Sequence, residues 1–144
     1  MKSLTLVDKA FFLKKTTLFG ALDLGLLLAI ADKLSLVTFD AGKTIFGLGE
    51  DAVRMYFVVK GSVEILNAKR QSVALLGEED FFGDEAIFNE KARTYEAVSK
   101  SGTVLLILSK TNLLNIISEC PSVAIGFIQA YTSATPFRPR AVAS

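Results

Sequence analysis

The 144-residue sequence predicts an α+β domain in which an all-β centre is flanked by helices at both ends. Near each end of the chain, apolar residues recur at the three- and four-residue spacing of a buried helix face. Between these segments, short β-prone runs alternate with glycine, aspartate, asparagine and lysine. Apolar residues make up 51% of the chain and are spread evenly, which is typical of an ordered globular domain.

The first part of the chain is expected to form two helices. Residues 4–13 and 22–34 both carry apolar side chains at helical spacing. The strongly apolar run at residues 24–31 is bounded by Asp23 and Asp32. It is too short to span a bilayer, which needs about 20 residues. We therefore expect buried helices and no membrane partner.

The middle of the chain is expected to form strands. The β-prone runs are residues 34–39, 44–46, 55–60, 62–66, 71–76, 94–99 and 103–108. Strands this short, with turn residues between them, favour antiparallel sheets arranged as a sandwich or barrel. Gly61 separates two strong runs and is expected in a tight corner, where glycine adopts a positive φ at little cost.

The end of the chain is expected to be helical again. Residues 110–118 have helical spacing, and Pro121 suits the first turn of a further helix. Pro136 and Pro139 bar the continuation of that helix. The whole chain, 1–144, is interpreted as a single domain. Its expected parts are helices within 4–34, strands within 35–109, helices within 110–133 and a loose tail at 134–144.

The composition excludes several kinds of active site and metal site. The chain has no histidine and one cysteine, so it has no histidine-based catalysis, no CxxC metal site and no intrachain disulfide. A formal charge of +1 gives no general field that attracts nucleic acid. No acid–base pair or activated nucleophile stands out, so we expect neither an enzyme nor a prosthetic group. The single thiol and the lack of a signal-like start favour a cytoplasmic protein.

Residues 81–99, FFGDEAIFNEKARTYEAVS, combine the groups that a phosphate-bearing ligand needs. Gly83 lets a ligand approach the backbone, and the N–H groups that follow it attract an anion. Arg93 presents a planar fork that matches phosphate oxygens, and the hydroxyl of Thr94 adds a donor. Asp84 would repel phosphate but accept a hydrogen bond from a sugar hydroxyl. A ligand with both a phosphate and a ribose would therefore use all four residues.

The same residues also have a purely structural interpretation. Asp84 and Glu85 would cap a short helix, and Arg93 would be a solvated strand residue. Carboxylates and arginines occur in every soluble protein, so the spacing alone leaves both interpretations open.

Five segments carry a resemblance to a known family. They are FFLKKTTLFGAL (residues 11–22), DAGKTIFGLGE (40–50), MYFVVKGSVEIL (55–66), DFFGDEA (80–86) and ARTYEAVS (92–99). In their order and spacing they resemble the cyclic nucleotide-binding domain family, and the match extends over residues 11–133. The last two segments are similar to the two halves of the family's phosphate-binding cassette.

The resemblance implies an antiparallel β-roll, a jelly-roll-like double-stranded β-helix, flanked by N- and C-terminal helices. A pocket for cAMP or cGMP would lie under the cassette, and the C-terminal helix would close it. Arg93 would pair with the cyclic phosphate, Thr94 would donate to it, and Asp84 would accept from the ribose. The other expected contacts are backbone groups at Gly83, Glu85 and Ala86, apolar side chains near the base at Phe46, Ile65 and Val73, and Tyr131 or Thr132 of the closing helix.

Several residues depart from the family pattern around the cassette. Asp84 is shorter than the usual glutamate, Glu85 replaces an apolar residue, and Ala92 replaces a proline. Glu79 stands where a glycine is expected, and Glu96 stands where some members have a small or hydroxyl residue. A carboxylate that faced the pocket would oppose a phosphate by like-charge repulsion.

The sequence leaves two functions open. The first is a stand-alone cyclic nucleotide sensor that moves its C-terminal helix and signals through an effector protein or a second copy. The second is a degenerate member of the fold that acts as a protein-interaction module without nucleotide.

Overall fold

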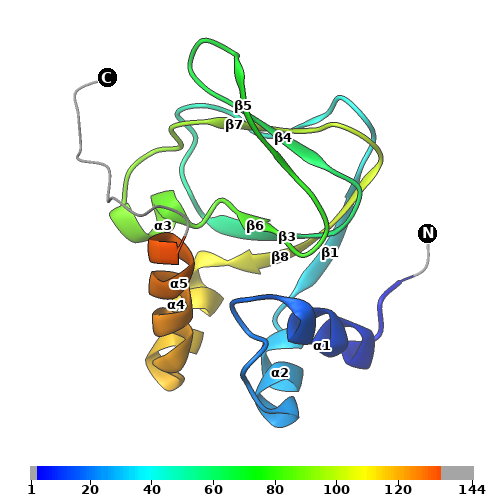
Figure 1. The fold of residues 1–144 in the computed structure, drawn as a ribbon, viewed down its shortest axis with the longest axis vertical. Helices are drawn as coiled ribbons and strands as arrows, with labels where there is room; N and C mark the ends of the chain where they lie inside the picture. Colours follow the sequence, from blue (N-terminus) through cyan, green and yellow to red (C-terminus); the bar gives the residue numbers. More distant parts are fainter. Residues whose placement is uncertain (1–2, 134–144) are drawn as a thin grey trace.

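The computed structural model describes residues 3–133, which form two antiparallel four-stranded sheets with helices outside them (Figure 1). In the first sheet the strand order is β1 (Ser35–Phe39), β8 (Thr103–Ser109), β3 (Arg54–Lys60) and β6 (Phe81–Phe82). In the second sheet it is β2 (Thr44–Phe46), β7 (Glu96–Ser99), β4 (Val63–Leu66) and β5 (Ser72–Leu76). The predicted α+β fold, a β-roll flanked by helices, is confirmed. The expected tail, residues 134–144, lies outside the described residues.

The N-terminal helices α1 (Leu6–Lys15) and α2 (Leu24–Ala31) pack against each other and against the first sheet. Thr5 and Asp8 form a capping box at the start of α1. Asp23 caps α2 through its side chain, which is why this helix begins later than the sequence pattern indicates.

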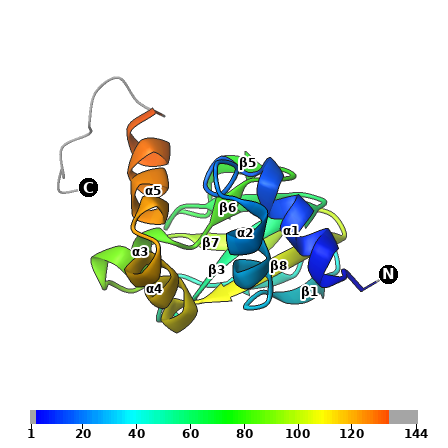
Figure 2. The ribbon, with the colours of Figure 1, turned by 90° about the horizontal axis from the view of Figure 1, so that it is seen from below.

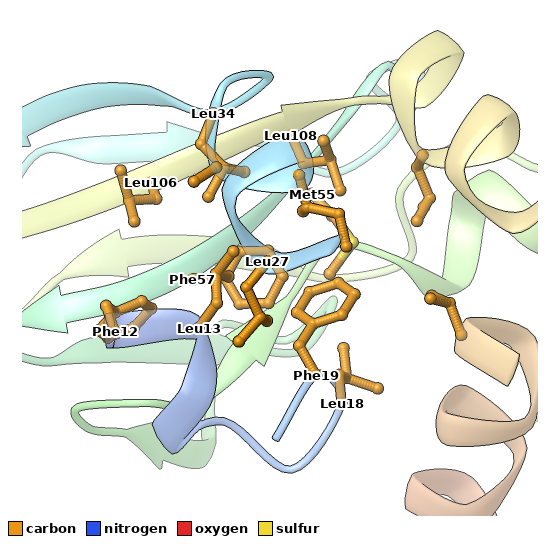
Figure 3. Packing of buried hydrophobic residues seen from close by; sticks show 14 of the residues in the cluster. Phe12, Leu13, Leu18, Phe19, Leu27, Leu34, Met55, Phe57, Leu106 and Leu108 are labelled. Carbon is orange, nitrogen blue, oxygen red and sulfur yellow. The ribbon is translucent and has the colours of Figure 1, made fainter. Parts of the chain in front are cut away.

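A hydrophobic cluster joins these helices to the outer face of the first sheet (Figure 3). Leu13, Phe19 and Leu27 are almost fully buried there, against Met55 and Phe57 of β3. The ring centroids of Phe19 and Phe57 lie 5.7 Å apart. Because burying one such side chain stabilises the fold by roughly 1.5–3 kcal/mol, this cluster anchors the helices to the sheet.

Strand β3 is buried on both faces, which explains its continuous apolar run. Met55 and Phe57 point toward the helices, whereas Tyr56 and Val58 point into the space between the two sheets. That inner space also holds Phe46 from β2 and further side chains of the second sheet.

Two C-terminal helices follow strand β8, and the second of them lies near strand β6. The helix α4 (Lys110–Glu119) begins at its cap Ser109, directly after β8, and α5 (Ser122–Ser133) is bent by 110° relative to it. Figure 2 shows α5 beside the short helix α3 (Glu85–Asn89). Within residues 3–133, no single helix has the length and hydropathy of a membrane span; only α4 and α5 taken together, as a bent pair, meet that test.

A tight turn at Gly61 and a short strand before Gly83 complete the description of the sheets. Gly61 has a φ of +91°, and a Cβ there would lie 2.4 Å from the Gly102 carbonyl oxygen, so the predicted tight corner is confirmed. The two-residue strand β6 was not expected from the sequence. It pairs Phe82 with Tyr56 of β3 and leads directly into Gly83.

Candidate functional site

The candidate site is the segment from Gly83 to Tyr95, called the cassette below, which runs from the end of β6 through α3 to the start of β7. Gly83 has a φ of +85°, and a Cβ at this residue would lie 3.1 Å from Nη1 of Arg93. Glycine is therefore needed both for the backbone conformation and for the approach of the arginine. At the other end, the Arg93 backbone is held by two hydrogen bonds of 2.9 Å to Gly49 and Glu50.

Arg93 is 4% exposed and its guanidinium lies against the backbone of the neighbouring elements. Its Nη1 donates to the Gly83 carbonyl and its Nη2 donates to the Arg54 carbonyl, at 2.5 and 2.6 Å. The guanidinium carbon lies 4.0 Å from the centre of the Phe46 ring, a cation–π contact. The interpretation of Arg93 as a solvated strand residue is wrong, because the inner cluster and the cassette cover it.

The charge of Arg93 is incompletely matched within the described part of the chain. Its buried Nε has no hydrogen-bond partner there. The ion pairs among residues 3–133 are Arg70–Glu96 and Lys100–Glu64, so Arg93 has no carboxylate within 4.0 Å. A buried cation without an anionic partner carries a desolvation cost that an anion would offset.

Asp84 is 2% exposed and faces α5. It stands at the N-terminal end of α3 but makes no capping hydrogen bond, so the interpretation of its side chain as a helix cap is wrong. Instead, the hydroxyl of Tyr131 donates to Oδ2 of Asp84. Burial raises the pKa of Asp84 to about 6, and the charge of Glu85 adds to that rise. The Asp84 carboxyl thus joins the cassette to the last helix.

Tyr95 is the main site residue that the sequence did not reveal. Its hydroxyl accepts a hydrogen bond from the Gly83 N–H at 2.9 Å and donates to Oε1 of Glu85 at 2.8 Å. Its ring lies 5.4 Å from the ring of Phe46. A signal was present, because Tyr95 lies within the segment ARTYEAVS, two residues after Arg93.

The structure brings together only part of the predicted site. The predicted residues that are buried in or beside the cassette are Gly83, Asp84, Ala86, Arg93 and Phe46. Glu85 is exposed and reaches the group through its hydrogen bond to Tyr95. Thr94 is exposed.

The predicted base contacts divide between the two faces of the second sheet. Ile65 is buried between the sheets, where its partner across the ladder is Ala74. Val73 is 58% exposed, because neighbouring residues of a strand point to opposite faces and Ala74 takes the inner one. Its expected contact with a base is therefore corrected: Val73 faces away from the inner space.

Glu96, another acidic departure from the family pattern, faces away from the space between the sheets. Ala97 lies in the inner cluster, so Glu96 is on the opposite face of β7, where it pairs with Arg70 at 3.1 Å. Within the described range, no group of three or more acidic or cysteine side chains has the arrangement of a metal site.

Comparisons with known proteins identify the family and the fold. Residues 36–120, more than half of the chain, fit the model of the cyclic nucleotide-binding domain family. A Rhodopseudomonas palustris protein, named as a candidate potassium channel protein, is 34% identical over 114 residues, which cover 76% of this chain and 27% of that protein. The cyclic AMP receptor protein of Thermus thermophilus is 32% identical over 90 residues, which cover 60% of this chain and 42% of that protein.

Solved structures share the fold over most of the chain. The regulatory subunit of a cAMP-independent protein kinase A from Trypanosoma brucei superposes with a TM-score of 0.76 and 24% identity, covering 91% of this chain and 48% of that one. The chain spans less than half of the length of the curated relatives described here. The family model matches more than half of the chain and the fold agrees with it, so the chain belongs to the cyclic nucleotide-binding domain family.

Proposed function

We propose that this chain is a regulatory domain that binds cAMP or cGMP beneath the cassette and transmits binding to a partner through α5. The observation that carries the proposal is the state of Arg93, a buried guanidinium with a free Nε and no carboxylate in ion-pair range among residues 3–133. A guanidinium matches two phosphate oxygens at once, so a cyclic phosphate would supply both the missing charge and the missing acceptor.

The other cassette residues are assigned roles around that phosphate. The Gly83 N–H and the exposed Thr94 hydroxyl are donors for its oxygens. Asp84 is an acceptor for a ribose hydroxyl, at the position where it now accepts from Tyr131. The aromatic ring of Phe46 and the side chain of Ile65 offer an apolar surface to the base.

Helix α5 is the proposed output element because it is bonded to the cassette by few contacts. Tyr131 donates to Asp84, and the Phe127 ring lies 5.0 Å from Phe88 and 5.7 Å from Phe81. A ribose that engages Asp84 competes with Tyr131 and so changes the balance between two positions of α5. A ligand shifts such an equilibrium only by its difference in affinity for the two states. An effector protein or a second copy would read the change.

Calorimetry with cAMP and with cGMP tests the proposal. The wild-type chain is expected to bind at least one of them, and Arg93→Ala is expected to weaken binding by at least about tenfold, since a charged hydrogen bond contributes roughly 1.5–3 kcal/mol. Arg70→Ala is the matched control, because Arg70 is exposed and forms its ion pair with Glu96, outside the cassette. Absence of heat and of any thermal shift in the wild type at millimolar nucleotide would contradict nucleotide binding.

A second candidate function is a protein-interaction module without nucleotide. The observation in its favour is that Gly83 and both Nη atoms of Arg93 are hydrogen-bonded within the chain. It predicts that neither nucleotide binds and that Arg93→Ala leaves partner binding intact. The same calorimetry therefore separates the two functions.

A further inference from the structure

We infer that Tyr95 sets the ligand affinity of the cassette: its hydroxyl occupies the Gly83 N–H, and a ligand phosphate must displace it to bind. This inference rests on the proposed function, since it concerns how the same site accepts a cyclic nucleotide. The two hydrogen bonds of the Tyr95 hydroxyl, to Gly83 and to Glu85, are called the Tyr95 latch below.

The Tyr95 hydroxyl and a ligand phosphate would compete for the same donor, the Gly83 N–H. A backbone amide has one hydrogen, so the Gly83 N–H donates either to Tyr95 or to a phosphate oxygen. The phenol is well matched in its present position, because it accepts from Gly83 at 2.9 Å and donates to Glu85 at 2.8 Å. A phosphate must therefore replace a satisfied internal bond rather than meet a free donor.

The latch also holds a negative charge beside the phosphate position. Glu85 is exposed, and its bond to the Tyr95 hydroxyl fixes the carboxylate at the cassette. Burial and the nearby Glu85 charge both raise the pKa of the Tyr95 hydroxyl, so it keeps its proton and continues to donate at neutral pH. The latch thus opposes a phosphate both by occupying the amide and by like-charge repulsion.

The ring of Tyr95 couples the latch to the arginine. The Phe46 ring lies 5.4 Å from the Tyr95 ring and 4.0 Å from the guanidinium carbon of Arg93. The two side chains that a phosphate would rearrange therefore rest on the same aromatic neighbour. Displacement of Tyr95 removes part of the packing that holds Arg93 toward the Gly83 and Arg54 carbonyls.

The first test needs no nucleotide. Tyr95→Phe removes the hydroxyl and keeps the ring, and the Gly83 amide hydrogen is expected to exchange with solvent several-fold faster by NMR, because its acceptor is gone. Tyr56→Phe is the matched control, since Tyr56 lies in the same inner cluster and stacks on Phe82 at 5.0 Å. An unchanged Gly83 exchange rate in Tyr95→Phe would overturn the inference.

The second test is calorimetry of the same proteins with cAMP and cGMP. Tyr95→Phe is expected to bind about 3- to 10-fold more tightly than wild type, the fold-change of one net hydrogen bond, and Tyr56→Phe to bind as wild type does. Glu85→Gln is expected to raise the affinity by a smaller factor, because it removes the charge and keeps an acceptor for Tyr95.

The results of the two tests distinguish a failure of the Tyr95 inference from a failure of the proposed nucleotide binding. If wild type and Tyr95→Phe bind nucleotide with equal affinity, the inference fails and the proposed function stands. If neither binds while Gly83 exchange accelerates, the proposed function fails and the competition fails with it. If only Tyr95→Phe binds, or binds more tightly, and Arg93→Ala in that background abolishes the gain, both are supported.

Discussion

Apart from Thr16 at the end of α1, the buried polar side chains among residues 3–133 lie in two regions that are built differently. Around the turns near β7 and β8, Ser99 and Thr103 are neutral and are satisfied by backbone atoms. Thr103 Oγ1, for example, donates to the Ser62 carbonyl at 3.0 Å. In the cassette, by contrast, the buried polar side chains are Asp84 and Arg93, both of which are ionisable.

The two regions differ in how many of their buried polar groups have hydrogen-bond or charge partners within the protein. The hydroxyls at the turns have protein partners, which is what a structural role requires. In the cassette, Arg93 keeps an unpartnered Nε, and burial raises the pKa of Asp84 to about 6. Charged groups left incompletely matched in a buried position destabilise a fold, and this is the argument for the ligand site proposed in the cassette. Substitutions in the two regions should therefore separate stability from binding.

The turns near β7 and β8 are called the structural region below, and Gly61 packs against them. Gly61→Ala is expected to give the largest loss of stability among these predictions. A Cβ at Gly61 would lie 2.4 Å from the Gly102 carbonyl oxygen, at a φ of +91°. The backbone strain and the clash together are expected to lower the free energy of unfolding by about 2–4 kcal/mol. Urea unfolding measures this. Gly77→Ala is the control, because a Cβ there meets nothing within 4 Å, and equal losses in both variants would contradict the geometric cause.

Asp84→Asn, in the cassette, is expected to change the pH dependence of stability. Because the folded-state pKa of Asp84 is raised from 3.8 to about 6, the folded state holds the proton more tightly than the unfolded state. The ionised carboxylate therefore destabilises the fold above about pH 6, and the penalty disappears as pH falls toward 4. When Asp84 is fully ionised, this penalty lowers the free energy of unfolding by an amount on the order of 3 kcal/mol.

Asparagine removes this titration and keeps an oxygen that accepts from Tyr131. In urea unfolding from about pH 4 to about pH 8, the stability of the variant relative to wild type is expected to rise between about pH 4 and about pH 6 and to stay constant above that. A difference between the two proteins that stays constant over this range would show that Asp84 titrates normally.

Ser99→Ala returns to the structural region with a smaller effect. Ser99 is fully buried; its hydroxyl donates to the Asp40 carbonyl at 2.5 Å and accepts from the Lys43 N–H at 3.1 Å. Losing these bonds is expected to lower the free energy of unfolding by about 1–3 kcal/mol. Nucleotide affinity, measured by calorimetry, should stay at the wild-type value. A weakened affinity in a variant that still folds would mean that the turns near β7 belong to the site.

The fold followed from the sequence because periodicity is a local property. The apolar run of β3 and the helical spacing of residues 24–31 are visible without tertiary information. The two-residue strand β6 is too short to have a period, and it was missed. Val73 was expected near the base from the family resemblance alone, and such a transfer by position is sensitive to a shift of one residue, which reverses the face of every side chain in a strand.

The residues of the candidate site could be selected from the sequence, but their hydrogen-bond partners could not. Gly83, Asp84 and Arg93 are recognisable by their order along the chain. The partners of these residues come from other elements: Tyr131 from α5 for Asp84, and the Arg54 carbonyl from β3 for Arg93. Contacts between elements depend on how helices and strands pack, which a single sequence does not display.

Glu79→Gly tests the smallest of the differences from the family pattern, just before the cassette. Glu79 has a φ of +75°, which costs a residue with a side chain roughly 1–2 kcal/mol relative to glycine. Glycine removes this backbone strain but also makes the unfolded chain more flexible, which offsets part of the gain. The free energy of unfolding, measured with urea, is therefore expected to rise by up to about 1 kcal/mol. The hydrogen bond from its N–H to the Val58 carbonyl, 2.8 Å long, remains.

Glu78→Gly is the matched control for this prediction, since Glu78 is an exposed glutamate outside the positive-φ region and should only lose stability. Because the Glu79 side chain is exposed, Glu79→Gly should leave nucleotide affinity unchanged. A gain in affinity would assign the Glu79 conformation to the ligand-binding machinery, and the boundary between the two regions would then move from Gly83 to Glu79.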